Sequence, residues 1–530
     1  MKITKKFNVF IALLLGVLVI MSSCEDGEDG MDGMDGVDGT DGTNGLDGMD
    51  GADGADGMDG MDGAGLTFFS SLAQVSLGDG VPEISTYDAN TQTVFATNSE
   101  AMEVDVIDIS DPTSPQIGAA IDVTAFGGNV NSVASQNGLL AIAVEAATAT
   151  DNGSIVIFDT SNLTTPMAQV TAGALPDMVT FTPDGSYILA ANEGEPNDDY
   201  TIDPVGSITI IEVATMTATQ VFFDSFNANE AMLEAEGFRV FGPGADLSTD
   251  VEPEYITVSS DSQTAFIALQ ENNGIAKLDI ASKTITDIYP LGTKDYSEVA
   301  FDLSDEDGVI GNLKTWPVLS FYQPDAIDYF EIGGTGYLIT ANEGDARDYD
   351  GYSEEERGDD LTLDPTAYPD AANLQLPENL GRLKVTTANG DTDDDGDIDQ
   401  IYGYGARSFS IWTTTGELLF DSGNEFSLLT LFDFGNYPEN RSDDKGTEPE
   451  AVTTYSDGTD TFAIIGLERS GDVLVYNIND IFNPRFEQRL RNTSPEGLLV
   501  ISPEDSPNGR TLLVVANEFP DNANLNIYYK

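Results

Sequence analysis

The chain has 530 residues, 40% of them hydrophobic, and its 93 Asp and Glu against 21 Lys and Arg give a formal net charge of −72 at pH 7. Such a charge repels nucleic acid and anionic lipid headgroups, so it excludes nucleic acid as a partner, and it attracts divalent cations. Because the chain has no histidine, it excludes Ser-His-Asp and Cys-His catalysis and His-ligated zinc, and any bound metal must be oxygen-ligated, as calcium and magnesium are.

Residues 1–23 are predicted to form a lipoprotein signal peptide. Three lysines within the first six residues precede an apolar stretch at 7–21, which is too short for a comfortable transmembrane span. Ser22, Ser23 and Cys24 follow at once, and Cys24 is the single cysteine of the chain, so it has no disulfide to form. The pattern resembles a bacterial lipoprotein signal, which implies cleavage before Cys24 and a lipid on that residue. An ordinary signal peptide with an accidental cysteine is the alternative.

A lipid on Cys24 predicts attachment to a membrane of the cell envelope. Glu25 and Asp26 follow the cysteine. Acidic residues at this place resemble the surface-export signals of some outer-membrane lipoproteins, and they also resemble inner-membrane retention signals. We expect a surface-exposed protein of the outer membrane.

Residues 24–65 are expected to form a lipidated stalk. Glycine occupies every third position from 27 to 63, and the repeat reads Gly-X-Asp except where Asn44 replaces the aspartate. This periodicity resembles a collagen-like triple helix, in which only glycine fits at the axis, and it implies a homotrimer. The segment has no proline, however, and three chains would stack their aspartates. The alternative is an extended, charge-stiffened spacer.

Residues 66–530 are predicted to form one large all-β domain. Short stretches rich in Val, Ile, Phe and Thr alternate with turns rich in Gly, Asp, Asn and Pro, and helical periodicity is nearly absent. A diffuse repeat opens most units with an acidic residue after proline and ends a central apolar strand in Asn or Glu. Seven such units fit a seven-bladed β-propeller, whose blades bury their faces against one another. A parallel β-helix is the alternative.

The repeated polar residues predict a functional mouth. Equivalent positions of successive blades form rings around a propeller axis, so these strand ends would meet at one end of the channel. Alternatively, each residue only caps a turn through a local hydrogen bond. The candidate mouth residues are Asn192, Glu193, Glu254, Asp325, Asn342, Glu343, Glu450, Glu468, Glu496, Asn517 and Glu518.

Three segments carry a resemblance to a known family: ANEGEP at 191–196, ANEGDARDY at 341–349 and GARSFSIW at 405–412. They closely resemble the bacterial choice-of-anchor I domain, which is related to the animal mesenchyme-specific cell-surface glycoproteins associated with biomineral deposition. The resemblance covers roughly residues 68–530 and implies a β-propeller on a surface anchor. The family has no established activity, although some members bear alkaline-phosphatase labels. Here the lipid is expected to replace the family's usual C-terminal sorting tail.

A calcium loop is predicted within an acidic insertion at about 345–402. Its candidate ligands alternate along the chain: Asp391, Asp393, Asp395, Asp397 and Asp399. This spacing, with Gly396 among the carboxylates, matches the first part of an EF-hand loop, where alternate oxygens converge on one cation. The twelfth position is Tyr402 rather than glutamate, so we expect the last ligand to come from elsewhere. An unliganded acidic turn is the alternative.

Few basic residues accompany these carboxylates. Arg347 follows Glu343 within an acidic segment, and Arg407 precedes Trp412, so each is either a handle for an anion or a partner in a structural ion pair. Glu343, Arg347 and Arg407 are the weak catalytic candidates.

Two functions are compatible with these features. The first is a non-enzymatic binding or adhesion module, stabilised by calcium, that engages an extracellular ligand or matrix component. The second is a calcium-dependent phosphoesterase resembling alkaline phosphatase or phytase-like propellers, in which clustered carboxylates hold metals and basic residues contact phosphate. The binding module needs fewer assumptions, and a structural stalk-and-head spacer is a third possibility.

Overall fold

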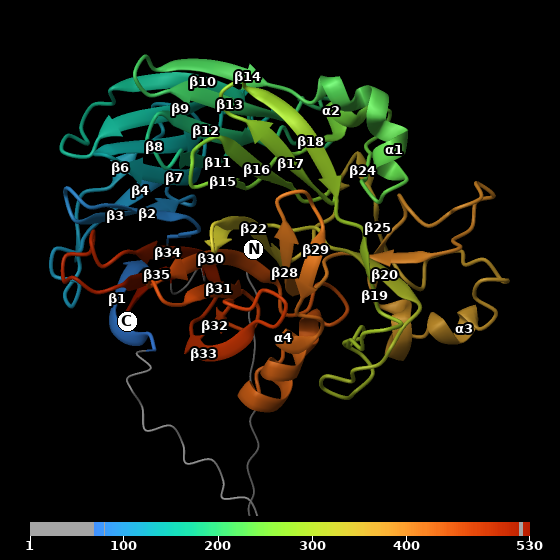
Figure 1. Ribbon diagram of the computed structural model, residues 1–530. Helices are drawn as coiled ribbons and strands as arrows, with labels where there is room; N and C mark the ends of the chain where they lie inside the picture. Colours follow the sequence, from blue (N-terminus) through green and yellow to red (C-terminus); the bar gives the residue numbers. More distant parts are fainter. Residues whose placement is uncertain (1–67, 79, 519–522) are drawn as a thin grey trace, which may run out of the picture. The chain divides into compact units, whose positions relative to one another are not determined.

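Strands make up most of the regular structure in the computed structural model, which describes residues 68–78, 80–518 and 523–530 (Figure 1). These residues contain 36 strands and four short α-helices. The predicted signal peptide, Cys24 and the predicted stalk lie outside the described residues. No described helix is both long and apolar enough to cross a membrane. The all-β class is confirmed.

Seven antiparallel sheets of four or more strands follow one another along the described chain. The first contains β2 (Ser85–Asp88), β3 (Thr93–Asn98), β4 (Glu103–Asp108), β5 (Gln116–Ile117) and β6 (Ile121–Asp122). The second contains β7 (Val130–Gln136), β8 (Leu139–Val144), β9 (Asn152–Asp159) and β10 (Ala168–Ala174). The third contains β11 (Pro176–Phe181), β12 (Tyr187–Asn192), β13 (Ser207–Glu212) and β14 (Thr217–Val221).

The remaining four sheets repeat this arrangement. The fourth contains β15 (Ile256–Val258), β16 (Thr264–Leu269), β17 (Gly274–Asp279) and β18 (Thr284–Pro290). The fifth contains β21 (Ile327–Ile332), β22 (Thr335–Asn342), β28 (Ser408–Thr413) and β29 (Leu418–Asp421). The sixth contains β30 (Pro449–Ser456), β31 (Thr461–Leu467), β32 (Asp472–Asn477) and β33 (Arg485–Arg491). The seventh contains β34 (Pro495–Ile501), β35 (Leu512–Asn517), β36 (Ala523–Tyr529) and β1 (Ser70–Gly78).

The first strands of the seven sheets form a closed ring. β2 contacts β7, β7 contacts β11, β11 contacts β15, β15 contacts β21, β21 contacts β30, β30 contacts β34, and β34 contacts β2 again. This is the arrangement of a propeller-like fold, with the first strand of each sheet nearest the axis. A parallel β-helix is wrong, because neighbouring strands within these sheets run antiparallel.

The ring is closed by the two ends of the domain's chain. β1 pairs with β36 in antiparallel register, with Ser70 opposite Tyr529 and Val75 opposite Leu525. The seventh sheet therefore takes its outer strand from the start of the domain and its other three strands from the end. This pairing ties the first sheet to the last and covers an edge that would otherwise remain unpaired.

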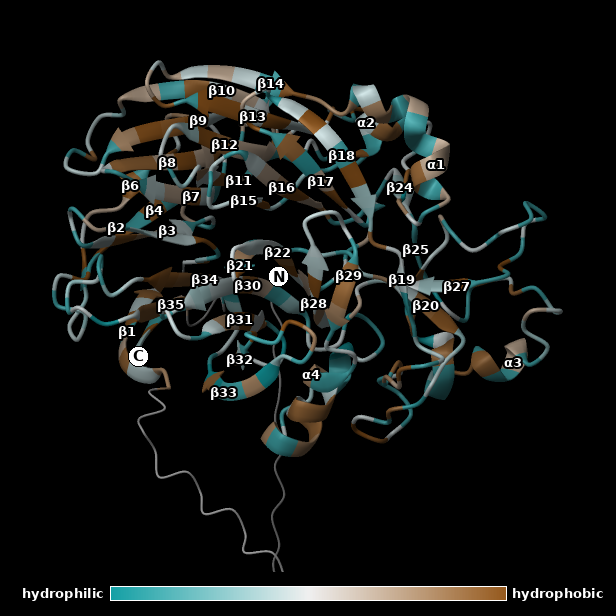
Figure 2. Ribbon diagram, viewed as in Figure 1, coloured by the Kyte–Doolittle hydropathy of each residue, from teal (hydrophilic) through white to brown (hydrophobic). Residues whose placement is uncertain are grey.

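The core consists of apolar layers between neighbouring sheets. One layer joins Leu189 of the third sheet to Ile267 of the fourth, and another joins Phe409 of the fifth to Tyr476 of the sixth. Because each sheet packs between two others, its inner strands are buried on both faces and are apolar along their length, as the brown strands of Figure 2 show.

A second, smaller core stands beside the fifth sheet. The chain leaves that sheet between β22 and β28, where the sequence predicts an insertion, and it passes through β23 (Asp348–Tyr349), β24 (Tyr352–Ser353), β25 (Glu355–Arg357), α3 (Ala371–Leu374), η2 (Pro377–Gly381), β26 (Lys384–Thr386) and β27 (Ile401–Gly403). β27 joins β19 (Thr293–Asp295) and β20 (Val318–Phe321), which precede the fifth sheet. Trp316 and Phe301 pack with Leu363 and Leu380, so both segments share one core.

The other helical segments are short and lie between strands. They are η1 (Asp224–Asn229), α1 (Glu230–Glu234), α2 (Leu247–Asp250), α4 (Glu425–Leu428), η3 (Leu429–Phe434) and η4 (Glu439–Arg441). α2 is the one that bears on the site, because its last residue, Asp250, is buried and faces an arginine of the insertion.

Candidate functional site

In six sheets, a carboxylate that follows proline is either the second residue of the first strand or lies two residues before that strand. Proline is tolerated at the first position of a strand because it cannot donate to the ladder, so it marks the same point in each sheet. The second sheet has an amide at this point. The residues are Glu83, Asn131, Asp177, Glu254, Asp325, Glu450 and Glu496. All of them except Glu254 line one cavity, and Tyr255 lines it in the fourth sheet, so this set, the inner ring, converges at one end of the molecule.

A second set of acids lies one or two residues beyond the second strand of six sheets. Its members, the outer ring, are Glu145, Glu193, Glu271, Glu343, Glu468 and Glu518. Serine takes the place in the first sheet. The first and second strands of each sheet are antiparallel, so the end of the second strand lies beside the start of the first strand. The outer ring therefore lies next to the inner ring.

Three groups of carboxylates show how close the two rings come. Within each group, one carboxylate oxygen of every member lies within 4.8 Å of those of the others. The groups are Glu193, Glu254 and Glu271; Asp325, Glu343 and Glu450; and Glu450, Glu468 and Glu496. Each combines residues of two neighbouring sheets, and the last two share Glu450.

The electrostatic environment of both rings favours protons or cations. Burial raises the pKa of Glu271 and of Glu343 to about 7. Burial and neighbouring carboxylates also raise the pKa of Glu83 and of Asp177 to about 7. Removing a carboxylate from water disfavours its charged form, and like charges nearby add to this. Near neutral pH, the mouth therefore holds partly protonated carboxylates whose charge a bound cation would stabilise.

Two basic side chains, Lys445 and Arg469, lie in the mouth that the inner and outer rings form. The Nζ of Lys445 lies 2.8 Å from Glu343 Oε1 and 3.4 Å from Asp345 Oδ1. Arg469 forms an ion pair with Glu468, and its Nε lies 2.8 Å from Glu448 Oε2. These basic residues belong to the sixth sheet and to the loop before it, so they compensate the carboxylates of the fifth and sixth sheets.

The predicted amides have a structural role. Asn192 donates to the carbonyl of Ser207 at 2.9 Å and to Thr209 Oγ1 at 2.9 Å. Asn342 donates in the same way to the hydroxyls of Ser408 and Ser410. Both bonds tie the second strand of a sheet to its third. Asn517 likewise bonds within its own sheet, to Asn524. The amides therefore face neighbouring strands, while the glutamates that follow them belong to the outer ring.

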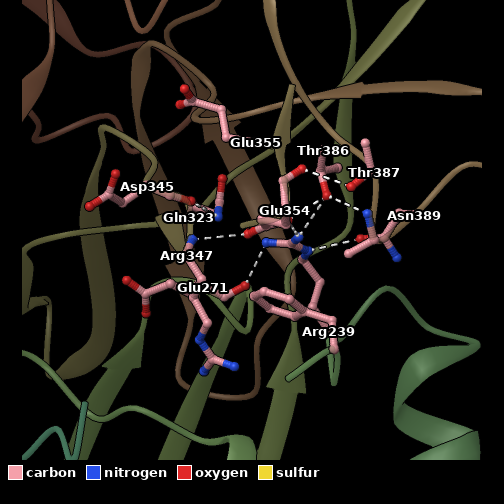
Figure 3. A network of polar contacts seen from close by, with 12 residues as sticks. Arg239, Glu271, Gln323, Asp345, Arg347, Glu354, Glu355, Thr386, Thr387 and Asn389 are labelled. Carbon is pink, nitrogen blue, oxygen red and sulfur yellow. Dashed lines mark hydrogen bonds and ion pairs between the residues drawn. The ribbon is translucent and has the colours of Figure 1, made fainter. Parts of the chain in front are cut away.

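Arg347 belongs to a buried network between the insertion and the fourth sheet. Its Nη1 lies 2.6 Å from Asp250 Oδ1 and its Nη2 lies 2.9 Å from Glu252 Oε2. Arg239 forms an ion pair with Glu354, which directly precedes β25, and the surrounding contacts are drawn in Figure 3. Since both guanidinium groups of Arg347 and Arg239 are almost fully buried and paired, they anchor the insertion.

Arg407 is also buried and structural. Its Nη1 donates to the carbonyl of Asp302 at 2.9 Å, and its Nη2 donates to the carbonyls of Ser442 and Asp444. These bonds hold together two loops beside the fifth sheet. Of the three catalytic candidates, only Glu343 therefore lies among the mouth carboxylates.

The predicted calcium loop lies in the insertion, away from the two rings in the sequence. Asp391, Asp393 and Asp399 form one group of converging carboxylates, and Asp364, Asp397 and Asp399 form another. Asp364 lies outside the loop. The sequence predicts that a further ligand comes from outside the loop. Asp395 belongs to neither group, and its main-chain N–H donates to Asp391 Oδ1 at 3.2 Å.

Several mouth residues are absent from the set predicted from sequence. Glu83, Asp177 and Asn131 of the inner ring, and Glu145 and Glu271 of the outer ring, were not among the candidates. The available signal was the position after proline at the start of a strand, which identifies Glu83 and Asp177 directly. Asn131 and Glu145 follow valine, so only their alignment with the other sheets identifies them.

The choice-of-anchor I domain matches residues 83–481, which is more than half of the chain. The chain belongs to the choice-of-anchor I family. The matched residues of this choice-of-anchor I domain include both rings except for the two acids of the seventh sheet, Glu496 and Glu518.

Two curated relatives share parts of this domain. Gigasin-3a of Magallana gigas is 33% identical over 122 residues, covering 20% of this chain and 43% of that protein. The mesenchyme-specific cell surface glycoprotein of Strongylocentrotus purpuratus is 36% identical over 138 residues, covering 24% of this chain and 18% of that protein. The chain thus spans less than half the length of these relatives. Together with the family match, they indicate a surface-associated, β-rich protein.

One solved structure is similar over most of the chain. Hydrazine synthase of Kuenenia stuttgartiensis covers 85% of this chain and 96% of its own, with 13% sequence identity and a TM-score of 0.46.

Proposed function

We propose that this choice-of-anchor I domain is a non-enzymatic, calcium-dependent binding module of the cell surface. In this proposal a lipid on Cys24 attaches it to the outer membrane, the Gly-X-Asp segment spaces it from that membrane or trimerises it, and the mouth faces an extracellular ligand or matrix component. The surface association of the family supports this placement.

The convergence of the two carboxylate rings is the observation that carries the proposal. Calcium takes six to eight oxygen ligands in flexible geometry, and a mouth of carboxylates offers such ligands without histidine or cysteine. A cation held there keeps coordination positions for water, which a carboxylate or phosphate group of a ligand can replace. The Asp391–Asp399 loop would hold a second, structural calcium that stabilises the insertion.

Calcium titration of the isolated domain tests this function. Residues 67–530 form a compact unit, so they can be studied without the lipid. After chelator treatment, we expect calorimetry to show calcium uptake and the melting temperature to rise, because a ligand that binds only the folded state stabilises it. The same preparation should not hydrolyse a phosphomonoester or phytate. A domain that neither binds calcium nor is stabilised by it would contradict the proposal.

One observation favours the phosphoesterase alternative. Glu450 belongs to two carboxylate groups, so it can bridge two cations, and Lys445 lies beside them on Glu343. Two-metal centres with a basic residue nearby catalyse phosphoryl transfer. Calcium-dependent turnover that the Glu343→Gln variant abolishes would establish this function instead of simple binding.

A further inference from the structure

The geometry points to a divalent-cation site, suited to calcium, formed by Glu193, Glu254 and Glu271 between the third and fourth sheets. It deepens the proposed function, on which it rests, by assigning one particular group of the mouth as the place where a cation is held. It is separate from the Asp391–Asp399 loop, which lies in the insertion.

The three carboxylates come from strand ends that the fold fixes. Glu193 follows β12, Glu271 follows β16, and Glu254 precedes β15. One oxygen of each lies within 4.8 Å of those of the other two. Since β12, β15 and β16 are held in their sheets by antiparallel ladders, this group is positioned before any ligand arrives, and little rearrangement is needed for binding.

Glu271 gives independent evidence of a missing partner. It is only 6% exposed, and its Oε2 is buried without a hydrogen-bond partner among the described residues. Oε2 of Glu254 is buried and unpartnered as well. Arg239 reaches only the main-chain carbonyl of Glu271, whose carboxylate points away from it (Figure 3). Buried polar atoms are almost always paired, so an unpartnered carboxylate oxygen here indicates a ligand.

The neighbouring group provides an internal comparison. In the fifth sheet, Glu343 occupies the outer-ring position of Glu271, and Lys445 compensates it at 2.8 Å. In the described part of the chain, no Lys or Arg forms an ion pair with Glu193, Glu254 or Glu271. The guanidinium of Arg347 is paired with Asp250 and Glu252, and that of Arg239 with Glu354. The fold therefore supplies a basic side chain, Lys445, to the group that contains Glu343. The group that contains Glu271 would need a cation from outside the protein.

The chemistry of the group selects the cation. Its donors are carboxylate oxygens alone, which suit calcium or magnesium and disfavour softer metals. Three carboxylates can supply up to about six oxygens to calcium, whereas magnesium requires near-ideal octahedral geometry and retains several waters. Calcium fits a set contributed by three separate strand ends better.

The test compares Glu271→Gln with Glu343→Gln in residues 67–530, above the raised pKa of both groups. Without calcium, we expect Glu271→Gln to melt at a higher temperature than the wild type, because it removes an unpaired buried charge. Glu343→Gln should show a smaller rise or none, because it also removes the carboxylate that pairs with Lys445 at 2.8 Å. Calorimetry should show that Glu271→Gln loses one calcium site, or binds there about tenfold or more weakly, as expected for the loss of a charged ligand.

A loop variant separates this inference from the proposed function. Asp391→Asn with Asp393→Asn should keep the calcium site that Glu271→Gln removes. If Glu271→Gln binds calcium with unchanged stoichiometry and affinity while the loop variant loses it, the site assigned here is wrong and the calcium-dependent function stands. If the wild type takes up no calcium, both are wrong.

Discussion

Replacing Arg347 with Met is expected to lower the free energy of unfolding by about 3–5 kcal/mol, as is typical when one partner of a buried ion pair is removed. The variant leaves Asp250 and Glu252 buried without the guanidinium that now lies 2.6 and 2.9 Å from their oxygens. It also removes one of the two arginines that anchor the insertion. Urea unfolding followed by tyrosine fluorescence or circular dichroism measures the change.

Arg382→Met is the matched control. Arg382 pairs with Asp305 at 3.0 Å, Asp443 at 3.2 Å and Glu306 at 3.6 Å, but 35% of its side chain is exposed, so its loss should cost less than that of Arg347, on the order of 1 kcal/mol. Adding Asp250→Asn and Glu252→Gln to Arg347→Met should recover part of the lost stability, since most of the cost lies in the unpaired charges. Equal losses for Arg347→Met and Arg382→Met would contradict the structural role assigned to Arg347.

Without divalent cations, the free energy of unfolding is expected to fall by several kcal/mol as the pH rises from about 4.5 to above 7. Burial raises the pKa of Glu271 and Glu343 from 4.5 to about 7 in the folded state. Between these values the folded chain binds more protons than the unfolded chain, so stability decreases with increasing pH. Each such group accounts for up to about 3 kcal/mol. Chemical unfolding at a series of pH values in chelator measures this slope.

Two controls identify the carboxylates of the mouth as the cause. High salt screens repulsion between surface charges but not between buried ones, so the slope should persist in it. Glu271→Gln should reduce the slope, because the amide does not titrate. Saturating calcium should also reduce it, because the cation stabilises the ionised carboxylates. A slope that salt abolishes and Glu271→Gln leaves unchanged would show that the surface charge causes it.

The sequence alone determines the class of the fold and much of its chemistry. Apolar strands bounded by turn residues predict an all-β domain, and the repeat of an acid after proline predicts sheets of one kind. The absence of histidine restricts any metal site to oxygen ligands. These conclusions rest on local patterns, which sequence spacing preserves.

The tertiary structure decides which of these residues work together. Asn192 and Glu193 are neighbours in the chain, yet one bonds to the third strand and the other belongs to the outer ring, since successive residues of an extended chain face opposite ways. The pairing of β1 with β36 joins residues from the two ends of the domain, which no local pattern predicts.

Tertiary contacts also decide which carboxylates are paired with a basic side chain. Glu271 and Glu343 have similar sequence surroundings, but only Glu343 meets Lys445, because the loop before the sixth sheet returns to the fifth. Arg347 and Arg407 were candidates for binding an anion, and their burial against carboxylates and carbonyls could be seen only in the folded chain. Sequence gives the charges, whereas packing from distant segments decides which of them remain unpaired.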